Sequence, residues 1–208
     1  MWQQPPRSDS SLEKANRTSH PSPMTVAEFT PEERVALLRV AHEAIAAALE
    51  DQAYIPCPTD RALAEPRGVF TTLYRDGRLR GCVGYVSAVR PLVNAVAETA
   101  RAAALEDTRF APVERVELAE IEVSLSVLSP TFAIEPGQIE IGRHGLVVRH
   151  NGHRGLLLPQ VATEHGWDVE TFLEQTCYKA GLPGNAWQHG AEIEAFTAEI
   201  FGDGALRE

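Results

Sequence analysis

The segment Leu-Arg-Gly-Cys-Val-Gly at residues 79–84 holds the side chain of this chain best suited to chemistry. Cys82 has Gly81 before it and Gly84 close behind it, so the backbone beside the thiol can be approached closely. Nearby positive charge favours the thiolate form, which attacks electrophiles, and four arginines lie near Cys82 in sequence: Arg75, Arg78, Arg80 and Arg90. Cys82 is therefore a candidate nucleophile, with a small buried hydrophobe as the alternative, since that is the usual role of free cysteine.

The same segment is predicted to form the second strand of a hairpin. Asp76-Gly77 separates two strand-like runs and is a strong signal for a two-residue turn. Such a turn places Arg80 and Cys82 on one face, opposite Thr71 and Leu73 on the partner strand. Arg80 then becomes a candidate for holding an anionic substrate beside the thiol.

Histidines gather around a second predicted hairpin. His144, next to Gly145, is a candidate general base for the thiol, and a surface strand histidine is the alternative. His150 and His153 flank Asn151-Gly152 and are expected to pair across that turn. A metal ion needs a third ligand, and His144 lies roughly 20 Å from His150 along an extended strand. The sequence therefore predicts no metal site.

Arg109 follows a predicted helix and has two readings. With Phe110 it could anchor an anion, or it could cap the preceding helix. The chain has no G-x-S-x-G, no Gly-rich phosphate loop and no G-x-G-x-x-G, which removes the main support for serine hydrolase, nucleotide-hydrolysing and Rossmann oxidoreductase functions. We therefore predict no cofactor.

Helices and hairpins alternate along the chain. Thr30 to Glu33 forms a capping box, and the helix behind it has an apolar stripe of Val35, Leu38, Ala41, Ile45 and Leu49. Further helices are expected over residues 91–105 and 168–179, the latter closed by Gly181, and strands over 68–75, 78–86, 121–128, 139–150, 153–158 and 192–201. Because hairpins require antiparallel pairing, we predict an α+β fold of two packed subdomains with mainly antiparallel sheets flanked by helices.

Composition narrows the function classes. The 208 residues carry a formal charge of −10, and residues 25–208 carry −11, which argues against general nucleic-acid binding. No apolar run approaches the roughly 20 residues of a membrane span. The three cysteines form no C-x-x-C pair, so we expect a reduced, cytoplasmic chain. Residues 1–24 are polar and rich in Pro and Ser, which predicts a disordered tail before a single domain at 25–208, with Met24 as an alternative start.

Several segments together resemble the AMMECR-one domain family, in its prokaryotic branch, whose members are labelled AmmeMemoRadiSam system protein A. They span about residues 30 to 202, and the combination is specific. The matching pieces are residues 79–84, Asp-Thr-Arg-Phe-Ala-Pro at 107–112, Glu-Val-Ser-Leu-Ser at 122–126, Ile-Gly-Arg-His-Gly at 141–145, 155–161, Gly166-Trp167 and 177–182.

The resemblance implies a two-subdomain α+β fold with the motif cysteine near a cleft between the subdomains. It also implies work alongside a Memo-like protein and a radical S-adenosylmethionine enzyme, whose genes often accompany this one, but it supplies no established reaction. Arg80, Cys82, Arg109 and His144 all fall on motif positions.

Two hypotheses follow. In the first, the chain is an enzyme in which Cys82, as a thiolate stabilised by Arg80, attacks a small anionic or nucleotide-like substrate. His144 carries the proton, Arg109 holds the carboxylate or phosphate, and Arg80 is counted with Arg109 as substrate-binding. In the second, it is a non-catalytic protein-interaction module that docks the Memo-like or radical enzyme partner through the Gly-rich hairpin. A concave site with converging arginine and histidine favours the enzyme, and an open shallow surface favours the module.

Overall fold

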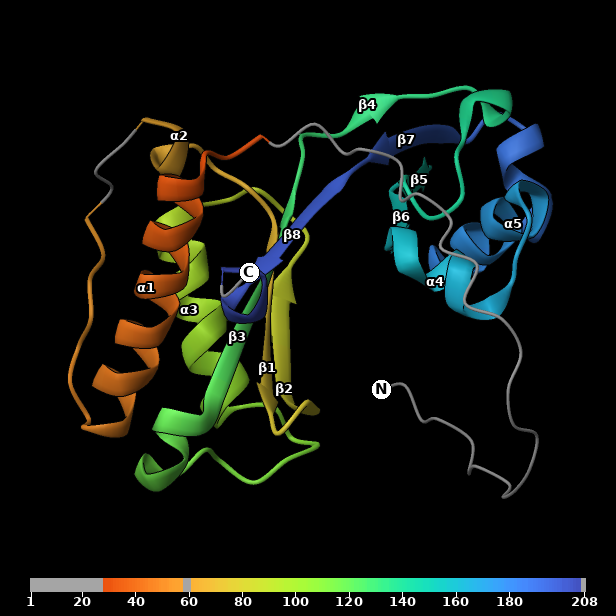
Figure 1. Cartoon of the computed structure of the whole chain (residues 1–208). Helices are drawn as coiled ribbons and strands as arrows, with labels where there is room; N and C mark the ends of the chain where they lie inside the picture. Colours follow the sequence, from red (N-terminus) through yellow and green to blue (C-terminus); the bar gives the residue numbers. More distant parts are fainter. Residues whose placement is uncertain (1–27, 58–60, 207–208) are drawn as a thin grey trace, which may run out of the picture.

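The computed structural model describes residues 28–57 and 61–206, so the predicted tail over residues 1–24 lies outside the described residues. Two antiparallel sheets of four strands each form the framework, which confirms the predicted α+β class (Figure 1). No helix in the described part of the chain is long and apolar enough to cross a membrane.

The first lobe is a sheet of order β2-β1-β3-β8, covered on one face by two helices (Figure 1). Its strands are β1 (Val69–Arg75), β2 (Arg78–Tyr85), β3 (Ile121–Leu128) and β8 (Ala198–Gly202), and its helices are α1 (Pro31–Leu49), the short α2 (Arg61–Ala64) and α3 (Leu92–Leu105). Thr30 caps α1 through the predicted capping box. The predicted apolar stripe is right except at its start, because Val35 is 48% exposed.

The second lobe is a smaller sheet of order β4-β7-β5-β6. Its elements are β4 (Phe132–Ala133), β5 (Gly145–His150), β6 (His153–Leu157), β7 (Glu192–Phe196), α4 (Pro159–His165) and α5 (Val169–Lys179), with α5 packed against β5 and β6. Asp168 caps α5, and Gly181 follows the helix at a φ of 73°, both as predicted. Short 3-10 turns occupy Arg115–Glu120, Pro136–Gln138, Gly184–Gln188 and Asp203–Leu206.

Two predicted strands differ from the structure. The strand expected from residue 139 begins only at Gly145, because the preceding residues turn through Gly142, whose φ is 84°. The strand expected over 192–201 is divided at Thr197 between the two sheets. Its apolar residues continue through the division, so the sequence gives no sign of the change of sheet. The helix α4 was missed because seven residues are too few to show a helical period.

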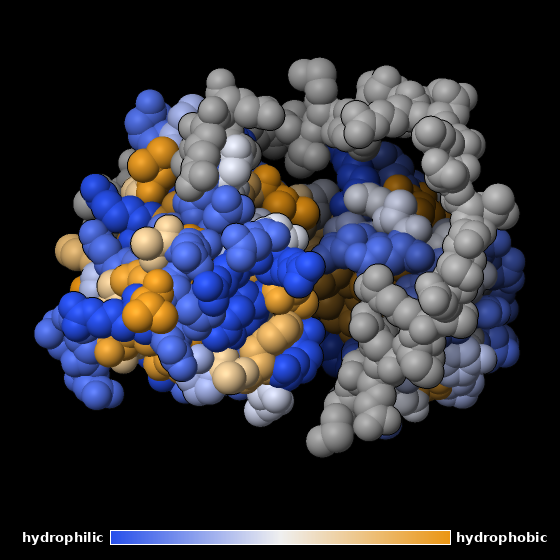
Figure 2. All heavy atoms as spheres, turned by 60° about the horizontal axis from the view of Figure 1, so that its bottom comes forward, coloured by the Kyte–Doolittle hydropathy of each residue, from blue (hydrophilic) through white to orange (hydrophobic). Residues whose placement is uncertain are grey.

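The two lobes are joined by paired crossing segments and by a shared apolar cluster. The chain passes between the sheets once from β3 to β4 and once from β7 to β8, and the Ser129 amide bonds the Thr197 carbonyl at 2.9 Å where these crossings meet. Phe70 and Val86 of the first lobe pack against Phe196 and neighbouring residues of the second. In Figure 2 the surface is hollowed between the lobes, with apolar residues beside the hollow.

The face of the first sheet that lies opposite α1 and α3, called here the open face, carries Cys82. The buried residues of β1 and β3 alternate with partly exposed ones, as expected when helices cover only one face. Register places Cys82 beside Thr72, Thr72 beside Ser124, and Ser124 beside Gly202. A row of small thiol, hydroxyl and glycine residues therefore runs across all four strands of the open face.

The hairpin forms with the predicted turn but with a shifted register. Asp76 and Gly77 both have positive φ, at 51° and 69°, as a tight turn of this kind requires. A β-bulge then moves the pairing, so that Cys82 faces Thr72 rather than Thr71, and Leu73 faces Gly81. Arg80 is the extra residue of the bulge and has no partner on β1. The sequence pattern gives no sign of it.

The two glycines beside Cys82 are required by packing inside the lobe. A Cβ on Gly81 would lie 2.1 Å from the carbonyl oxygen of Ala103 in α3, and a Cβ on Gly84 would lie 2.2 Å from the ring of Phe70. The small residues at these positions therefore let a helix and an aromatic ring approach β2 closely. A bulky substitution at either glycine would damage the fold, so it cannot by itself reveal a docking surface.

We expect Gly81→Ala to destabilise the protein by about 1–3 kcal/mol, because the new methyl group must displace the α3 backbone. Urea denaturation followed by circular dichroism measures the change. Gly137→Ala is the matched control, since a Cβ at Gly137 meets nothing within 4 Å, and we expect a change within about 0.5 kcal/mol. Equal stability of the two variants would contradict the proposed close approach of α3.

Candidate functional site

Cys82 is half-buried on β2, the edge strand of the first sheet. The Thr72 hydroxyl on the neighbouring strand donates to its sulfur over 3.4 Å, and its backbone N–H donates to Asp107 Oδ2 over 2.8 Å. Both the sulfur and the backbone of this residue are therefore fixed by polar neighbours. This environment differs from that of Cys177, which is fully buried and whose thiol pKa is raised by burial.

Asp107 and Arg109 close the outer edge of β2 at Cys82. The Asp107 carboxylate accepts from Arg109 Nε at 2.9 Å and from Nη2 at 2.7 Å, and Nη2 also lies 3.5 Å from the Cys82 carbonyl oxygen. The pair thus contacts the Cys82 N–H and C=O groups, which a further strand added to the sheet would otherwise hydrogen-bond. The Arg109 hydrogen bonds hold the pKa of Asp107 at about 2, against the opposing effect of burial.

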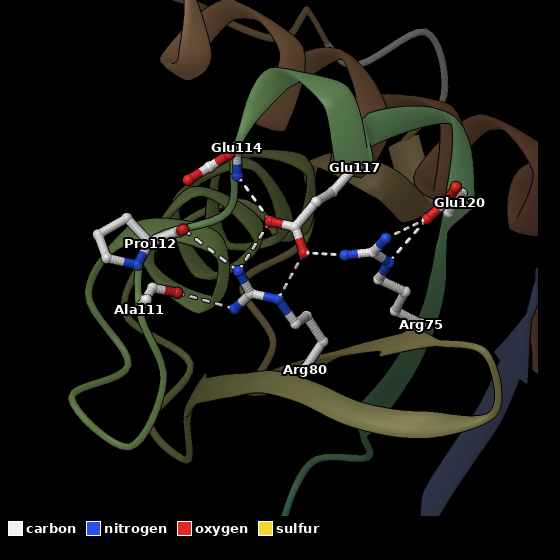
Figure 3. A network of polar contacts seen from close by, with 7 residues as sticks. All are labelled: Arg75, Arg80, Ala111, Pro112, Glu114, Glu117 and Glu120. Carbon is white, nitrogen blue, oxygen red and sulfur yellow. Dashed lines mark hydrogen bonds and ion pairs between the residues drawn. The ribbon is translucent and has the colours of Figure 1, made fainter.

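The Arg80 side chain points into a network of protein groups (Figure 3). Its Nε and Nη2 bond both oxygens of Glu117 at 3.0 and 2.9 Å, and Nη1 bonds the Ala111 carbonyl at 2.8 Å. Nη2 also reaches the Pro112 carbonyl at 3.2 Å. Because all three of its nitrogens are engaged, we assign Arg80 to positioning the 107–117 loop rather than to holding a substrate.

Glu117 is the acidic centre of that network. Its side chain is 9% exposed and contacts Arg80 and Arg75 together. The hydrogen bond from Arg80, with further help from the Glu114 backbone, lowers its pKa to about 2 in spite of burial. The carboxylate therefore stays ionised throughout the neutral range and ties the end of the β1–β2 hairpin to the loop that carries Asp107.

Carboxylates compensate most of the positive charge near Cys82. Arg75 and Arg80 pair with Glu117, and Arg90 pairs with Glu98. Arg109 is paired through one side of its guanidinium only: its Nη1 has no hydrogen-bond partner among the described residues, and its side chain is 56% exposed. Of the two predicted anion-binding arginines, Arg109 alone keeps a donor available.

His144 lies in the turn before β5, in the second lobe. Its Nδ1 accepts a hydrogen bond from the Glu140 backbone N–H at 3.0 Å, and its ring meets the edge of Phe132. Burial lowers its pKa, with a smaller opposing effect from Glu140, so the neutral imidazole is favoured with its proton on Nε2. Among the described residues no hydrogen bond or ring contact joins His144 to Cys82.

His150 and His153 are cross-strand partners at the end of the β5–β6 hairpin, as the sequence predicts. In the described part of the chain there is no group of three or more His, Cys, Asp or Glu side chains arranged to hold a metal ion.

Comparisons with known proteins give the family. The AMMECR1 family profile matches residues 38–201. The chain belongs to the AMMECR1 family. A protein of Methanopyrus kandleri is 44% identical over 186 residues, covering 84% of this chain and 90% of that protein, and one of Methanothermobacter thermautotrophicus is 42% identical over 188 residues, covering 86% and 98%.

A solved structure is similar as well. The crystal structure of an uncharacterized protein from Pyrococcus horikoshii has 42% sequence identity and a TM-score of 0.66, covering 80% of this chain and 89% of that one. The names of these AMMECR1 relatives state no activity.

In this AMMECR1 chain, two of the motif segments form one physical unit. Asp107 and Arg109 bind the backbone of Cys82, and Arg80 binds carbonyl groups at the end of the 107–112 segment. Sequence reasoning singled out the cysteine and the arginines but missed Asp107, Glu117 and Thr72. Asp107 stands two residues before Arg109, a spacing that allows a local ion pair, whereas only the folded hairpin reveals the other two.

We expect acid to remove the contribution of Glu117 to stability. Since its folded pKa of about 2 lies below the ordinary value of 4.5, that contribution is complete above pH 4.5 and is lost as the pH falls toward 2. Glu117→Gln should flatten this part of the stability profile and cost about 1–3 kcal/mol at pH 7, because Arg80 loses its charged partner.

Urea unfolding at a series of pH values measures the effect. Glu120→Gln is the control, because Glu120 is 52% exposed and contacts only Arg75 in this network. If the free energy of unfolding of Glu117→Gln changes with pH as steeply as that of the wild type between pH 4.5 and 2, the network does not stabilise the ionised Glu117 carboxylate.

Proposed function

We propose that this AMMECR1 protein is an enzyme in which Cys82 acts as the nucleophile on a small anionic or nucleotide-like substrate, with Arg109 binding the anionic group. The observation that carries this proposal is the position of the thiol. Cys82 is half-buried on the open face, accepts a hydrogen bond from Thr72, and has its carbonyl oxygen 3.5 Å from Arg109, whose guanidinium keeps an available donor.

The open face carries further polar groups near Cys82. Ser124 lies in the same row as Cys82 and Thr72, and the next row places Ser126 beside Phe70. Neither serine hydroxyl has a hydrogen-bond partner among the described residues, so both are available to a ligand. Hydroxyl groups beside an aromatic ring are the mixture of polar and apolar contacts typical of small-molecule sites.

The roles differ from the sequence-based hypothesis in two respects. Arg80 positions the loop that carries Asp107, and Arg109 binds the anion without it. His144 stabilises its own turn through Nδ1 and makes no described contact with the thiol, so the proposal needs no histidine as proton carrier. The expected setting is still work alongside a Memo-like protein and a radical S-adenosylmethionine enzyme.

Alkylation by iodoacetamide tests the nucleophile directly, with the other cysteines as internal references. At pH 7 we expect Cys82 to react faster than the exposed Cys57 and Cys177 to stay unlabelled in the native protein. Arg109→Gln should slow the alkylation of Cys82 about threefold to tenfold, because a positive charge near the reacting sulfur is removed. Asp107→Asn should accelerate it by a similar factor, because a nearby negative charge is removed. Peptide mass spectrometry over time gives the rate at each cysteine.

The opposite signs separate electrostatics from disruption. Both substitutions break the same Asp107–Arg109 pair, so a change caused only by opening the β2 edge would have the same direction in both variants. Cys82 reacting more slowly than Cys57, or the two variants shifting together, would end the case for an electrostatically activated thiol.

A second candidate function is a non-catalytic module that docks the same partners, and exposed apolar side chains on the open face favour it. Tyr74 and Leu79 are cross-strand neighbours that are 36% and 42% exposed, and Ile200 on β8 is 61% exposed. The docking surface would be this face rather than the β2 edge, because Asp107 and Arg109 already close that edge at Cys82.

Binding and turnover distinguish the two functions. If the chain is a module, Cys82→Ala binds the purified Memo-like or radical enzyme partner with unchanged affinity and supports its cellular function, whereas Ile200→Ser weakens binding about tenfold. If it is an enzyme, Cys82→Ala removes the function while the fold is retained. Biolayer interferometry gives the affinities, and a metabolite comparison of cells carrying each variant gives the function. Val116→Ser is the control, since Val116 is 80% exposed but lies outside the sheet.

A further inference from the structure

A cavity of about 360 Å³ lies where the two lobes meet, away from Cys82. Segments of both lobes line it: the chain before β1, the loop after β2, the β3–β4 crossing and the β5–β6 hairpin. Its size lies within the range of sites for small molecules. The side chains that matter for its chemistry are Arg67, Ser87, Arg149 and Arg154, with Val86 and Val89 as apolar parts of the wall.

The charged side chains that line this cavity are all positive. Three arginines line it and no carboxylate does, although the whole chain has a formal charge of −10. Guanidinium groups gathered in one recess repel each other unless an anion lies between them. The lining therefore indicates a negatively charged ligand.

Two of the arginines are direct cross-strand partners. Arg149 and Arg154 face each other on β5 and β6, where like charges are destabilising. Arg149 Nη2 lies 2.9 Å from Glu194 Oε2, although this carboxylate oxygen accepts no well-formed hydrogen bond. Arg154 has no carboxylate partner among the described residues; its Nη1 donates instead to the Ser87 hydroxyl of the other lobe at 3.2 Å.

The third arginine carries an unused donor. Arg67 pairs through Nη2 with Glu28 and Glu65, and its side chain is 11% exposed. Its Nη1 is buried and has no hydrogen-bond partner among the described residues. Leaving such a donor unpaired is costly, and because the atom is buried it meets a ligand in the cavity only if the Arg67 side chain turns.

We infer that this cavity binds the phosphate group of a small phosphorylated molecule. Arg149, Arg154 and Arg67 approach from different segments, and Ser87, which accepts from Arg154, keeps its own proton to donate. Donors arranged around a centre suit a tetrahedral phosphate, whereas a planar carboxylate is satisfied by one guanidinium fork. Val86 and Val89 offer apolar contacts to the rest of the molecule.

This site is separate from the proposed thiol chemistry. Val86 lies four residues beyond Cys82 along the chain, which is roughly 13 Å in an extended strand. None of the residues that bind phosphate here belongs to the group formed by Cys82, Asp107 and Arg109. The inference therefore holds whether or not Cys82 is a nucleophile.

Thermal unfolding in different salts tests the site on the whole chain. With inorganic phosphate as the probe, we expect the wild-type midpoint to rise by several degrees relative to chloride at the same ionic strength and pH, since a ligand that binds only the folded state stabilises it. Arg154→Gln should lose this rise and should unfold no earlier than the wild type in chloride, because repulsion with Arg149 is relieved. Arg78→Gln, an exposed arginine on the β1–β2 hairpin, should keep the full rise.

Further arms decide the ligand class. Acetate at the same ionic strength should leave the midpoint unchanged, and isothermal titration with adenosine monophosphate should show one site that is lost in Arg154→Gln. Cys82→Ala should bind the nucleotide as the wild type does, which separates this result from the fate of the proposed enzyme. The inference is overturned if Arg154→Gln keeps the rise of the unfolding midpoint in phosphate, or if Arg78→Gln loses it equally. It is also overturned if acetate produces the same rise.

Discussion

The hydrogen bond from the Cys82 backbone to the Asp107 carboxylate is the contact on which the arrangement of the candidate site depends. It fixes an edge strand to a loop 25 residues further along the chain, and Arg109 completes the contact through the Cys82 carbonyl. An edge strand normally exposes unpaired backbone groups that invite pairing with another chain. Here a charged side-chain pair meets those groups at the cysteine, so the thiol side chain stays on the open face while its backbone is protected.

Compensation of charge divides the arginines of this protein into two groups. Arg80 and Arg75 converge on Glu117, where ionised partners are hydrogen-bonded and largely removed from solvent, as a structural network requires. Arg154 and Arg149 converge on a cavity whose lining has no carboxylate. Arg149 has Glu194 as an ion-pair partner, but Arg154 faces Arg149 across the hairpin and has no carboxylate partner among the described residues, so this second group is the one that calls for a ligand. The number of arginines in a segment is thus a poor guide to anion binding; their unsatisfied donors are a better one.

The parts of the fold that could be predicted are those set by local signals. The capping box of α1, the Asp76-Gly77 turn and the Asp168 cap each depend on a few adjacent residues, and each forms as the sequence predicts. The bulge beside Arg80 and the change of sheet at Thr197 depend on packing between distant segments, and a periodic pattern carries no trace of them. For the same reason the sequence indicated Cys82, Arg80 and Arg109 as candidate site residues but not Glu117, whose carboxylate engages Arg80.

The crossing of the chain between the sheets explains why both candidate sites lie where they do. Because β8 continues from β7 and β4 continues from β3, the second sheet is displaced along the strands of the first instead of covering it, and only the end of the open face near Phe70 and Val86 is packed (Figure 1). Among the described residues, no helix covers the rest of that face, where Cys82 lies. The same displacement brings the β5–β6 hairpin to the start of β1 and the end of β2, where Arg154 meets Ser87. One topological feature therefore produces both an uncovered thiol and an arginine-lined cavity. Because the Ser129 hydroxyl accepts from the Thr197 N–H at 3.0 Å where the crossings meet, we expect its removal to disturb the two together.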